Sequence, residues 1–320
     1  MFQESPRAPT NAGVCRAAAK IAEILPPTPL LPVEISGVNC WVKAESLQPI
    51  GAFKIRGAWH RLSDLTAEER ERGVVGVSSG NHAQGVAWAA RKLGIAATIV
   101  MPRDAPQMKL DATRALGAEV VLYQRPGEDR DVIANQLCDE LGATLVHAYA
   151  DPWVIEGQGS AGIEITTQLG RQPGAIVACC GGGGLSAGLA LACPDSRIFP
   201  VEPEGWDDVA RSLAAGEILS IGQNPPATAC DALQTPMTAP VNFAVLHGRV
   251  EPGIAVSELE IREAQRFAFA RLKLVLEPGG AAALAACLAG KVELDPDTVI
   301  MLTGGNVDPA SFAKVIASAD

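Results

Sequence analysis

The sequence has no long apolar run, no excess of positive charge and no closely spaced cysteine motif. Charged residues, glycine or proline interrupt every apolar stretch before it reaches the length of a membrane span. The first residues, from Met1 to Arg7, lack the basic start and the apolar run of a signal peptide. A formal net charge of −10 argues against nucleic acid as a partner. These absences predict a globular protein with neither nucleic acid nor a membrane as partner.

The spacing of the cysteines argues against a zinc site and against a disulfide framework. Eight cysteines are scattered along the chain, and only Cys179 and Cys180 are adjacent. No Cys-x-x-Cys spacing predicts a zinc site, and nothing predicts a disulfide framework. A reduced, cytoplasmic compartment is therefore expected. At 320 residues, the chain is long enough for one or two domains with a large core.

Apolar strand-like runs alternate with helical patterns along most of the chain. A hairpin is expected over residues 34–43, with its turn at Ser36-Gly37 or at Asn39. Further strands are expected at 73–77, 97–101, 119–123, 145–147, 175–179, 197–201 and 298–302. Helices are expected at 14–25, 83–93, 107–116, 130–141, 154–169, 185–192, 208–215, 258–272 and 280–289. Continuous Val/Ile strands, each followed by a helix, are typical of parallel sheets covered on both faces. The pattern predicts an α/β protein of two three-layer α/β/α domains, each with its own mainly parallel sheet.

Lys54 is the first candidate catalytic residue. It follows Phe53 and the helix-breaking Gly51, and a helical segment is expected from about Gly57. Beside Arg56 and a helix start, its ammonium form should be disfavoured, so that the free amine could attack a carbonyl. A lone lysine is more commonly a solvated surface residue. The motifs further along the chain decide between the two interpretations.

Four glycines, Gly181 to Gly184, join a predicted strand to a predicted helix. Such a loop lets backbone N–H groups converge on an anion at a helix N-terminus, which predicts a phosphate site. No Gly-Lys-Ser/Thr follows, so the loop is not a Walker A motif. A weaker alternative is a dinucleotide fingerprint, in which Gly182, Gly184 and Ala187 fit G-x-G-x-x-A and Glu202 is the ribose-binding acid.

Three further turns offer polar groups at strand or helix ends. Ser78-Ser79-Gly80-Asn81-His82 is a strand-to-helix turn that suits a carboxylate or a phenolic oxygen, or simply caps the helix. His82 by itself fits a structural histidine at a helix start. Thr303 offers a hydroxyl after the last strand. Glu277-Pro278-Gly279-Gly280 opens an Ala-rich helix, and packing explains this turn at least as well as catalysis does.

These features together meet the needs of one cofactor. Pyridoxal phosphate requires a Schiff-base lysine, a phosphate site and a partner for its ring nitrogen. The chain resembles the fold-type II pyridoxal phosphate enzymes, and within them the threonine/serine dehydratase and serine racemase branch, which includes 3-hydroxyaspartate dehydratases. The resemblance covers about residues 28–308 and rests on five motifs in order, at 51–58, 79–82, 181–184, 277–280 and 303–306.

The resemblance implies a role for each matching residue. Lys54 would carry the cofactor and Phe53 would lie against its ring. Asn81 would bind the phenolic oxygen, and Thr303 would meet the ring nitrogen. The phosphate would be held by Gly181, Gly182, Gly183 and Gly184. A neutral hydroxyl at the ring nitrogen favours elimination. The resemblance also implies a homodimer, with a large cofactor-binding domain over 1–48 and 150–320 and a small substrate-side domain over 49–149.

Other matches concern the branch within the family. Ser79 falls where racemases place a serine opposite the lysine. Arg130 falls at the outer end of the substrate pocket, where it could grip a second carboxylate, or it is an ordinary helix-start arginine. Glu202, Asp208 and the carbonyl of Trp206 resemble a site for Mg²⁺ or Ca²⁺, or they are solvated loop residues.

The sequence thus predicts a dehydratase (ammonia-lyase) that converts a β-hydroxy amino acid to a 2-oxo acid and ammonia. L-threonine or L-serine is the expected substrate, or 3-hydroxyaspartate if Arg130 reaches the pocket. Ser78 to His82 would bind the α-carboxylate. The alternatives are a serine/aspartate-type racemase using Lys54 and Ser79, an NAD-dependent oxidoreductase, and a non-catalytic module that binds a phosphate ligand.

Overall fold

A computed structural model describes residues 7–125 and 127–317 of the chain. The strands are β1 (Leu30–Ile35), β2 (Val38–Ala44), β3 (Val74–Val77), β4 (Ala97–Pro102), β5 (Glu119–Tyr123), β6 (Thr144–Val146), β7 (Ala175–Cys179), β8 (Arg197–Pro203), β9 (Ile254–Val256) and β10 (Thr298–Leu302). The helices of the first half are α1 (Asn11–Ala22), α2 (Lys54–Ser63), α3 (Ala67–Arg72), α4 (Asn81–Leu93), α5 (Gln107–Ala115), α6 (Arg130–Leu141) and α7 (Pro152–Leu169). Those of the second half are α8 (Gly184–Ala192), α9 (Asp208–Ala215), α10 (Pro240–Leu246), α11 (Glu258–Phe267), α12 (Pro278–Leu288) and α13 (Pro309–Ala317). Among the described residues, no helix is long and apolar enough to cross a membrane.

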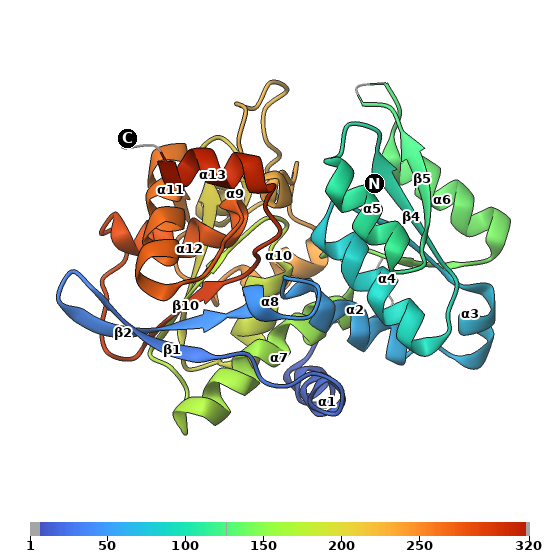
Figure 1. Cartoon of the computed structure of the whole chain (residues 1–320). Helices are drawn as coiled ribbons and strands as arrows, with labels where there is room; N and C mark the ends of the chain where they lie inside the picture. The colour runs from blue at the N-terminus through green and yellow to red at the C-terminus, as the bar shows by residue number, and fades with distance from the viewer. Residues whose placement is uncertain (1–6, 126, 318–320) are drawn as a thin grey trace.

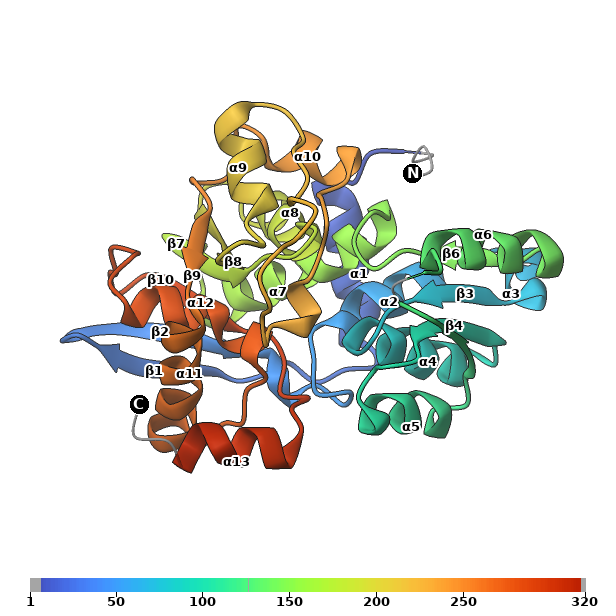
Figure 2. The ribbon, with the colours of Figure 1, turned by 90° about the horizontal axis from the view of Figure 1, so that it is seen from above.

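The strands form two separate sheets, as the sequence predicts. The larger has the order β1-β2-β10-β7-β8-β9, and the smaller has the order β5-β4-β3-β6. Every neighbouring pair is parallel except β1 and β2, which form the predicted hairpin. Its turn is at Ser36-Gly37, where φ is 51° and 81°, and not at Asn39. Figures 1 and 2 show the small sheet with its helices at one side of the molecule and the large sheet at the other. The predicted domain boundaries themselves stay a prediction, and residues 1–6 and 318–320 of the predicted large domain lie outside the described residues.

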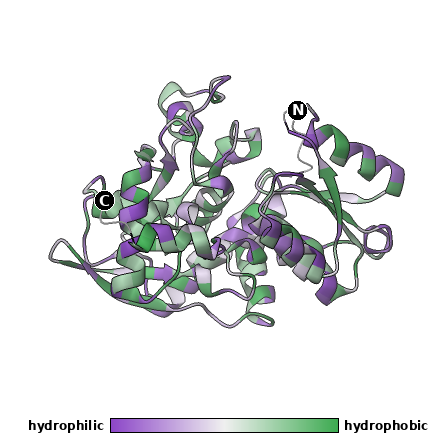
Figure 3. Ribbon diagram, turned by 45° about the horizontal axis from the view of Figure 1, so that its top comes forward, coloured by the Kyte–Doolittle hydropathy of each residue, from purple (hydrophilic) through white to green (hydrophobic). Residues whose placement is uncertain are grey.

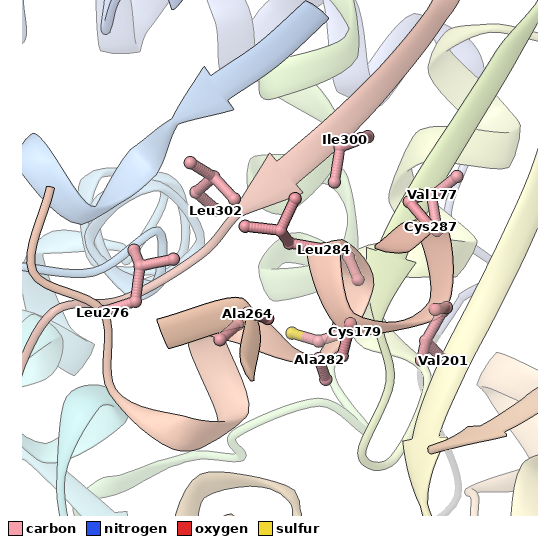
Figure 4. Packing of buried hydrophobic residues seen from close by; sticks show 14 of the residues in the cluster. Val177, Cys179, Val201, Ala264, Leu276, Ala282, Leu284, Cys287, Ile300 and Leu302 are labelled. Atoms are coloured by element: carbon pink, nitrogen blue, oxygen red, sulfur yellow. The ribbon is translucent and has the colours of Figure 1, made fainter. Parts of the chain in front are cut away.

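The Ala-rich α12 fills the core beside the large sheet. Its small side chains allow close packing against the apolar faces of β7 and β10 and against α11. In Figure 4, Leu284 and Cys287 of α12 lie beside Ile300 of β10 and Val177 of β7. Figure 3 shows hydrophobic residues concentrated in the strands, whereas the outer helices carry mixed colours. Buried strands with amphipathic helices over them are what the continuous Val/Ile runs predict.

The carboxyl ends of β3 and β6 in the small sheet and of β7 and β10 in the large sheet lead into the loops that hold the candidate residues. The helix α2 connects the elements around the small sheet to those around the large sheet, because it packs against both α4 and α7. A bridge between Ala52 and Gly304 ties the segment before Lys54 to the loop after β10. This arrangement places Lys54 between the two sheets.

Candidate active site

One cavity brings together every residue that the sequence predicts for catalysis, cofactor binding and substrate binding. Its wall includes Lys54 and Phe53, the whole turn from Ser78 to His82, the glycines Gly181 to Gly184, Arg130 and Thr303. These residues come from loops far apart in the sequence, which meet because parallel strands end at a common edge. The three predicted metal-binding residues are not among the residues that line this cavity.

Lys54 begins α2 and faces the cavity. Its Nζ donates a hydrogen bond of 2.8 Å to the carbonyl oxygen of Ala148, and it lies 5.2 Å from the centroid of the Phe53 ring. Burial lowers the pKa of Lys54 to about 8, although the nearby Cys179 opposes the shift. About one tenth of the side chain is then free amine at pH 7, far more than for an exposed lysine, and the free amine is the form that acts as nucleophile and proton acceptor.

Arg56 has a different role from the one expected. It donates two hydrogen bonds of 2.7 Å to the carboxylate of Glu45 and one of 2.9 Å to Glu164. These partners neutralise its charge, so burial and not Arg56 lowers the pKa of Lys54. The bidentate pair fixes the start of α2 against the end of β2 and against α7, and thereby fixes the backbone of Lys54.

The glycine loop is shaped by close contacts that exclude any side chain. A Cβ on Gly182 would lie 2.3 Å from the Tyr149 ring, and one on Gly181 would lie 2.8 Å from Oγ1 of Thr235. Gly183 has a φ of 86° and caps α8, whose first helical residue is Gly184. The loop therefore presents bare backbone at a helix N-terminus, which fits a phosphate group.

Thr303 and Asn81 occupy positions that suit a pyridine ring. Oγ1 of Thr303 is 3.1 Å from Sγ of Cys179, and the backbone N–H of Phe53 donates to the carbonyl oxygen of Thr303 at 3.0 Å. Burial raises the pKa of Cys179 to about 11, so it is a neutral thiol. Asn81 opens α4, is 7% exposed and hydrogen-bonds across to Glu277 and Asn306. A hydroxyl, an amide and a glycine loop around a buried lysine are the donor set that pyridoxal phosphate needs.

The turn before α4 presents hydrogen-bond donors to the cavity. Oγ of Ser78 accepts from the backbone N–H of Gly80 at 3.1 Å, and the first turn of α4 leaves N–H groups without intrahelical partners. The His82 side chain points to β6 instead, where Nε2 is 2.8 Å from the carbonyl oxygen of Val146. Burial, and then the charge of Lys54, lower the pKa of His82 to about 3. His82 is thus a neutral side chain bonded to the small sheet.

Arg130 begins α6 and lies on the cavity wall with two residues that the sequence analysis did not identify, His147 and Tyr149. Burial, and then the charge of Arg130, lower the pKa of His147 to about 3. Nδ1 of His147 accepts from the backbone N–H of Ala150 at 2.9 Å, which places the ring proton on Nε2. Both residues follow the carboxyl end of β6, and that position is the signal that could have identified them.

Two other charged residues of the cavity wall were not predicted from the sequence. Lys109 of α5 and Asp231 form an ion pair that joins a helix beside the small sheet to the elements around the large sheet. Lys109 is 5% exposed, and its side chain lies beside Gly80. No sequence motif marks either residue, because the pair forms only when the two groups meet.

The predicted metal residues lie between the end of β8, which contains Glu202, and the start of α9, which is Asp208. The carboxylate of Glu202 accepts from the backbone N–H groups of Val209 at 3.0 Å and Ala210 at 2.8 Å. Both oxygens of the fully buried Asp208 lack a hydrogen-bond partner in the described structure. Burial raises the pKa of both carboxyls, to about 7 for Asp208. Two neighbouring buried carboxyls, of which only Asp208 has oxygens without a hydrogen-bond partner, fit a hard cation, although the described residues hold no cluster of three or more His, Cys, Asp or Glu side chains.

Comparison with known proteins identifies the class. Residues 21–304 match the family described as pyridoxal-phosphate dependent enzyme, so the chain belongs to that family. It is 40% identical over 318 residues to an L-threo-3-hydroxyaspartate ammonia-lyase of Saccharomyces cerevisiae, with 97% of each chain covered. It is 42% identical over 286 residues to a Pseudomonas protein of the same name, with 88% of this chain and 89% of that one covered. The structure of maize serine racemase superposes with a TM-score of 0.90 at 33% identity, covering 96% of this chain and 97% of that one.

These matches confirm the resemblance drawn from the five motifs, including the fold-type II architecture. They favour a pyridoxal phosphate enzyme over the alternative of an NAD-dependent oxidoreductase. The structure gives an independent reason against that alternative, because Glu202 is buried and its two oxygens bind the first turn of α9 instead of a ribose.

Proposed function

We propose that this enzyme is a pyridoxal phosphate-dependent ammonia-lyase whose preferred substrate is a 3-hydroxyaspartate. The single observation that carries the proposal is Arg130 on the wall of the cavity that also holds Lys54 and the glycine loop. A guanidinium there supplies a bidentate partner for a second carboxylate, which threonine and serine lack. The two relatives named as L-threo-3-hydroxyaspartate ammonia-lyases support the same substrate class.

The residues of this chain divide the work of elimination among them. Pyridoxal phosphate, when bound, withdraws electrons from the α-carbon and so eases removal of the α-proton and loss of the β-hydroxyl. The turn from Ser78 to His82 holds the α-carboxylate by hydroxyl and N–H donors. Nζ of Lys54 accepts the α-proton, because burial favours its free amine. The β-hydroxyl takes up one proton, which balances the proton that Lys54 accepts, and leaves as water. Hydrolysis of the resulting enamine consumes one water and yields a 2-oxo acid and ammonia.

The proposal is tested by measuring 2-oxo acid release from L-threonine, L-serine and the isomers of 3-hydroxyaspartate, side by side. We expect a kcat/KM for one 3-hydroxyaspartate isomer at least 10-fold above that for serine or threonine, because charge-assisted hydrogen bonds are the strong ones. A preference for threonine or serine would make the enzyme a general dehydratase and Arg130 a bystander.

Racemisation is a second candidate on the same scaffold. Ser79 lies on the cavity wall with Lys54, so each could exchange a proton with the α-carbon. The overall likeness to maize serine racemase favours this reading. Chiral analysis of unreacted serine and aspartate in the assay mixtures measures it directly. Appearance of the opposite enantiomer faster than 2-oxo acid would make racemisation the main activity.

We also propose that Glu202, Asp208 and the carbonyl of Trp206 hold Mg²⁺ or Ca²⁺. A cation present at 100 times its Kd stabilises the folded state by about 2.7 kcal/mol, which moves Tm by several degrees. We therefore expect Tm to fall when EDTA replaces Mg²⁺ or Ca²⁺. Asp208→Asn should abolish this response, because it removes one buried carboxylate. An equal Tm in chelator and in either cation would remove the metal site.

Assembly and location complete the proposal. We infer a homodimer from the family resemblance and a cytoplasmic location from the scattered, unpaired cysteines of the described chain.

A further inference from the structure

A chain of hydrogen bonds runs from a backbone carbonyl to the cavity. Nδ2 of Asn306 lies 2.8 Å from the carbonyl oxygen of Ile50 and 2.8 Å from Oδ1 of Asn81. A carbonyl oxygen only accepts, so the Asn306 atom that faces Ile50 must be the amide nitrogen. Both hydrogens of that nitrogen are then used, and Oδ1 of Asn81 is the acceptor of the second.

The orientation of the Asn81 amide follows from this bond. Its oxygen faces Asn306, so its nitrogen faces the other way and donates to Oε1 of Glu277. An amide nitrogen carries two hydrogens, and this bond uses one of them. Asn81 lines the cavity, so its second hydrogen is left as a donor for an oxygen bound there.

Glu277 closes the chain from the opposite side. It is fully buried, lines the cavity and precedes α12, and its backbone N–H donates to the carbonyl oxygen of Gly304 at 3.1 Å. A Cβ on Gly304 would lie 2.0 Å from Oε1 of Glu277, so the carboxyl fits only because residue 304 is a glycine. Its other oxygen, Oε2, has no hydrogen-bond partner among the described residues.

We propose that Asn306 and Glu277 are positioning residues, which together hold the Asn81 amide with one N–H directed into the cavity. The inference rests on the proposed function in one respect, namely that Asn81 meets the phenolic oxygen of pyridoxal phosphate. It gives a role to two residues whose motifs the sequence analysis left to packing or did not assign. It also makes Glu277 the ionisable group in direct contact with the residue that binds this oxygen.

The charge of Glu277 depends on its surroundings. Burial raises its pKa to about 7, with Lys109 opposing the shift, Asp231 adding to it and the bond from Asn81 opposing it. Cys179 is a neutral thiol with a pKa of about 11, raised mainly by burial and also by the charge of Glu277. Ionisation of Glu277 strengthens the Asn81 bond and adds a negative charge near the cofactor ring. The visible absorption of the bound cofactor should therefore change with pH around neutrality.

The test uses three variants and two readouts, cofactor affinity and the pH dependence of the cofactor's visible band. Asn306→Asp removes both donors, so we expect the Kd for pyridoxal phosphate to rise about 10-fold. Glu277→Ala should weaken binding similarly. Glu277→Gln still accepts from Asn81 but does not ionise, so its Kd should stay within about threefold of wild type and its spectral transition near pH 7 should disappear. Asn39→Asp, at an exposed position of the β1–β2 hairpin, is the matched control and should change neither readout.

Wild-type Kd and spectrum in Asn306→Asp and Glu277→Ala would overturn the inference, as would an unchanged pH transition in Glu277→Gln. If Asn306→Asp does not fold, as judged by its Tm, the isosteric Glu277→Gln still decides the question. No substrate is used, so the outcome is separate from that of the proposed function. A protein that binds the cofactor normally but releases no 2-oxo acid would count against the activity and not against these positioning residues.

Discussion

Lys54→Ala is expected to lose 2-oxo acid release by a factor on the order of 1,000 or more. In the proposed mechanism the same residue supplies the amine that binds the cofactor and the base that takes the α-proton, so one substitution removes both. No other lysine can replace it in the described cavity wall, because Lys109 is held by Asp231. The visible absorption of the cofactor-loaded protein should disappear with the activity.

Borohydride reduction provides the measurement that locates the bond. In the wild type it should fix the cofactor to Lys54, and mass spectrometry of the resulting peptides should find the added mass on that residue. Lys92→Ala is the matched control, since Lys92 is exposed on the last turn of α4 beside Trp88. A Lys54→Ala protein that turned over substrate at the wild-type rate would show that the mechanism is wrong.

Much of the fold was predictable because its strands are buried on both faces. The Val/Ile runs of β3, β4, β7 and β10 leave no polar face, and such strands read clearly in a sequence. Short elements were missed, including α3, α10, α13 and the three-residue β9. Their patterns are too brief for a period to show, and tertiary packing supplies most of their stability.

Helix boundaries differed where local signals conflict. The helix α2 begins at Lys54 itself and not near Gly57, because Phe53 and the bridge at Ala52 set its start. The helical pattern over 258–272 is α-helical only to Phe267 and continues as a π-helical turn to Leu272, with Lys273 in the left-handed region. Neither feature follows from side-chain periodicity.

In the candidate site, too, some residues can be predicted from the sequence and others cannot. Lys54 and the glycine loop were predictable, because a motif marks each of them. Tyr149 and Asp231 were not, because their roles depend on which loops meet at the cavity. The cause of the lowered pKa of Lys54 was also beyond the sequence, since it required knowing that Glu45 and Glu164 neutralise Arg56.

Arg130→Ala is expected to lower kcat/KM for 3-hydroxyaspartate roughly 10- to 100-fold, while kcat/KM for serine stays within about threefold of wild type. The Arg130 side chain is 37% exposed and only 3.9 Å from its neighbour Asp131, so it is available to a ligand but partly screened by water. Arg130→Lys should recover part of the loss, because lysine keeps the charge but lacks the planar fork that binds both carboxylate oxygens.

The decisive quantity is the ratio of kcat/KM for 3-hydroxyaspartate to kcat/KM for serine, because a general loss of stability lowers both values together. Arg125→Ala is the matched control: Arg125 is similarly exposed and pairs with Asp104, but it does not line the cavity. Its substrate ratio should equal that of the wild type. If Arg130→Ala lowered kcat/KM for both substrates equally, Arg130 would act on the fold of α6 and its neighbours and not on substrate choice. A loss confined to the dicarboxylate would place the second carboxylate at Arg130.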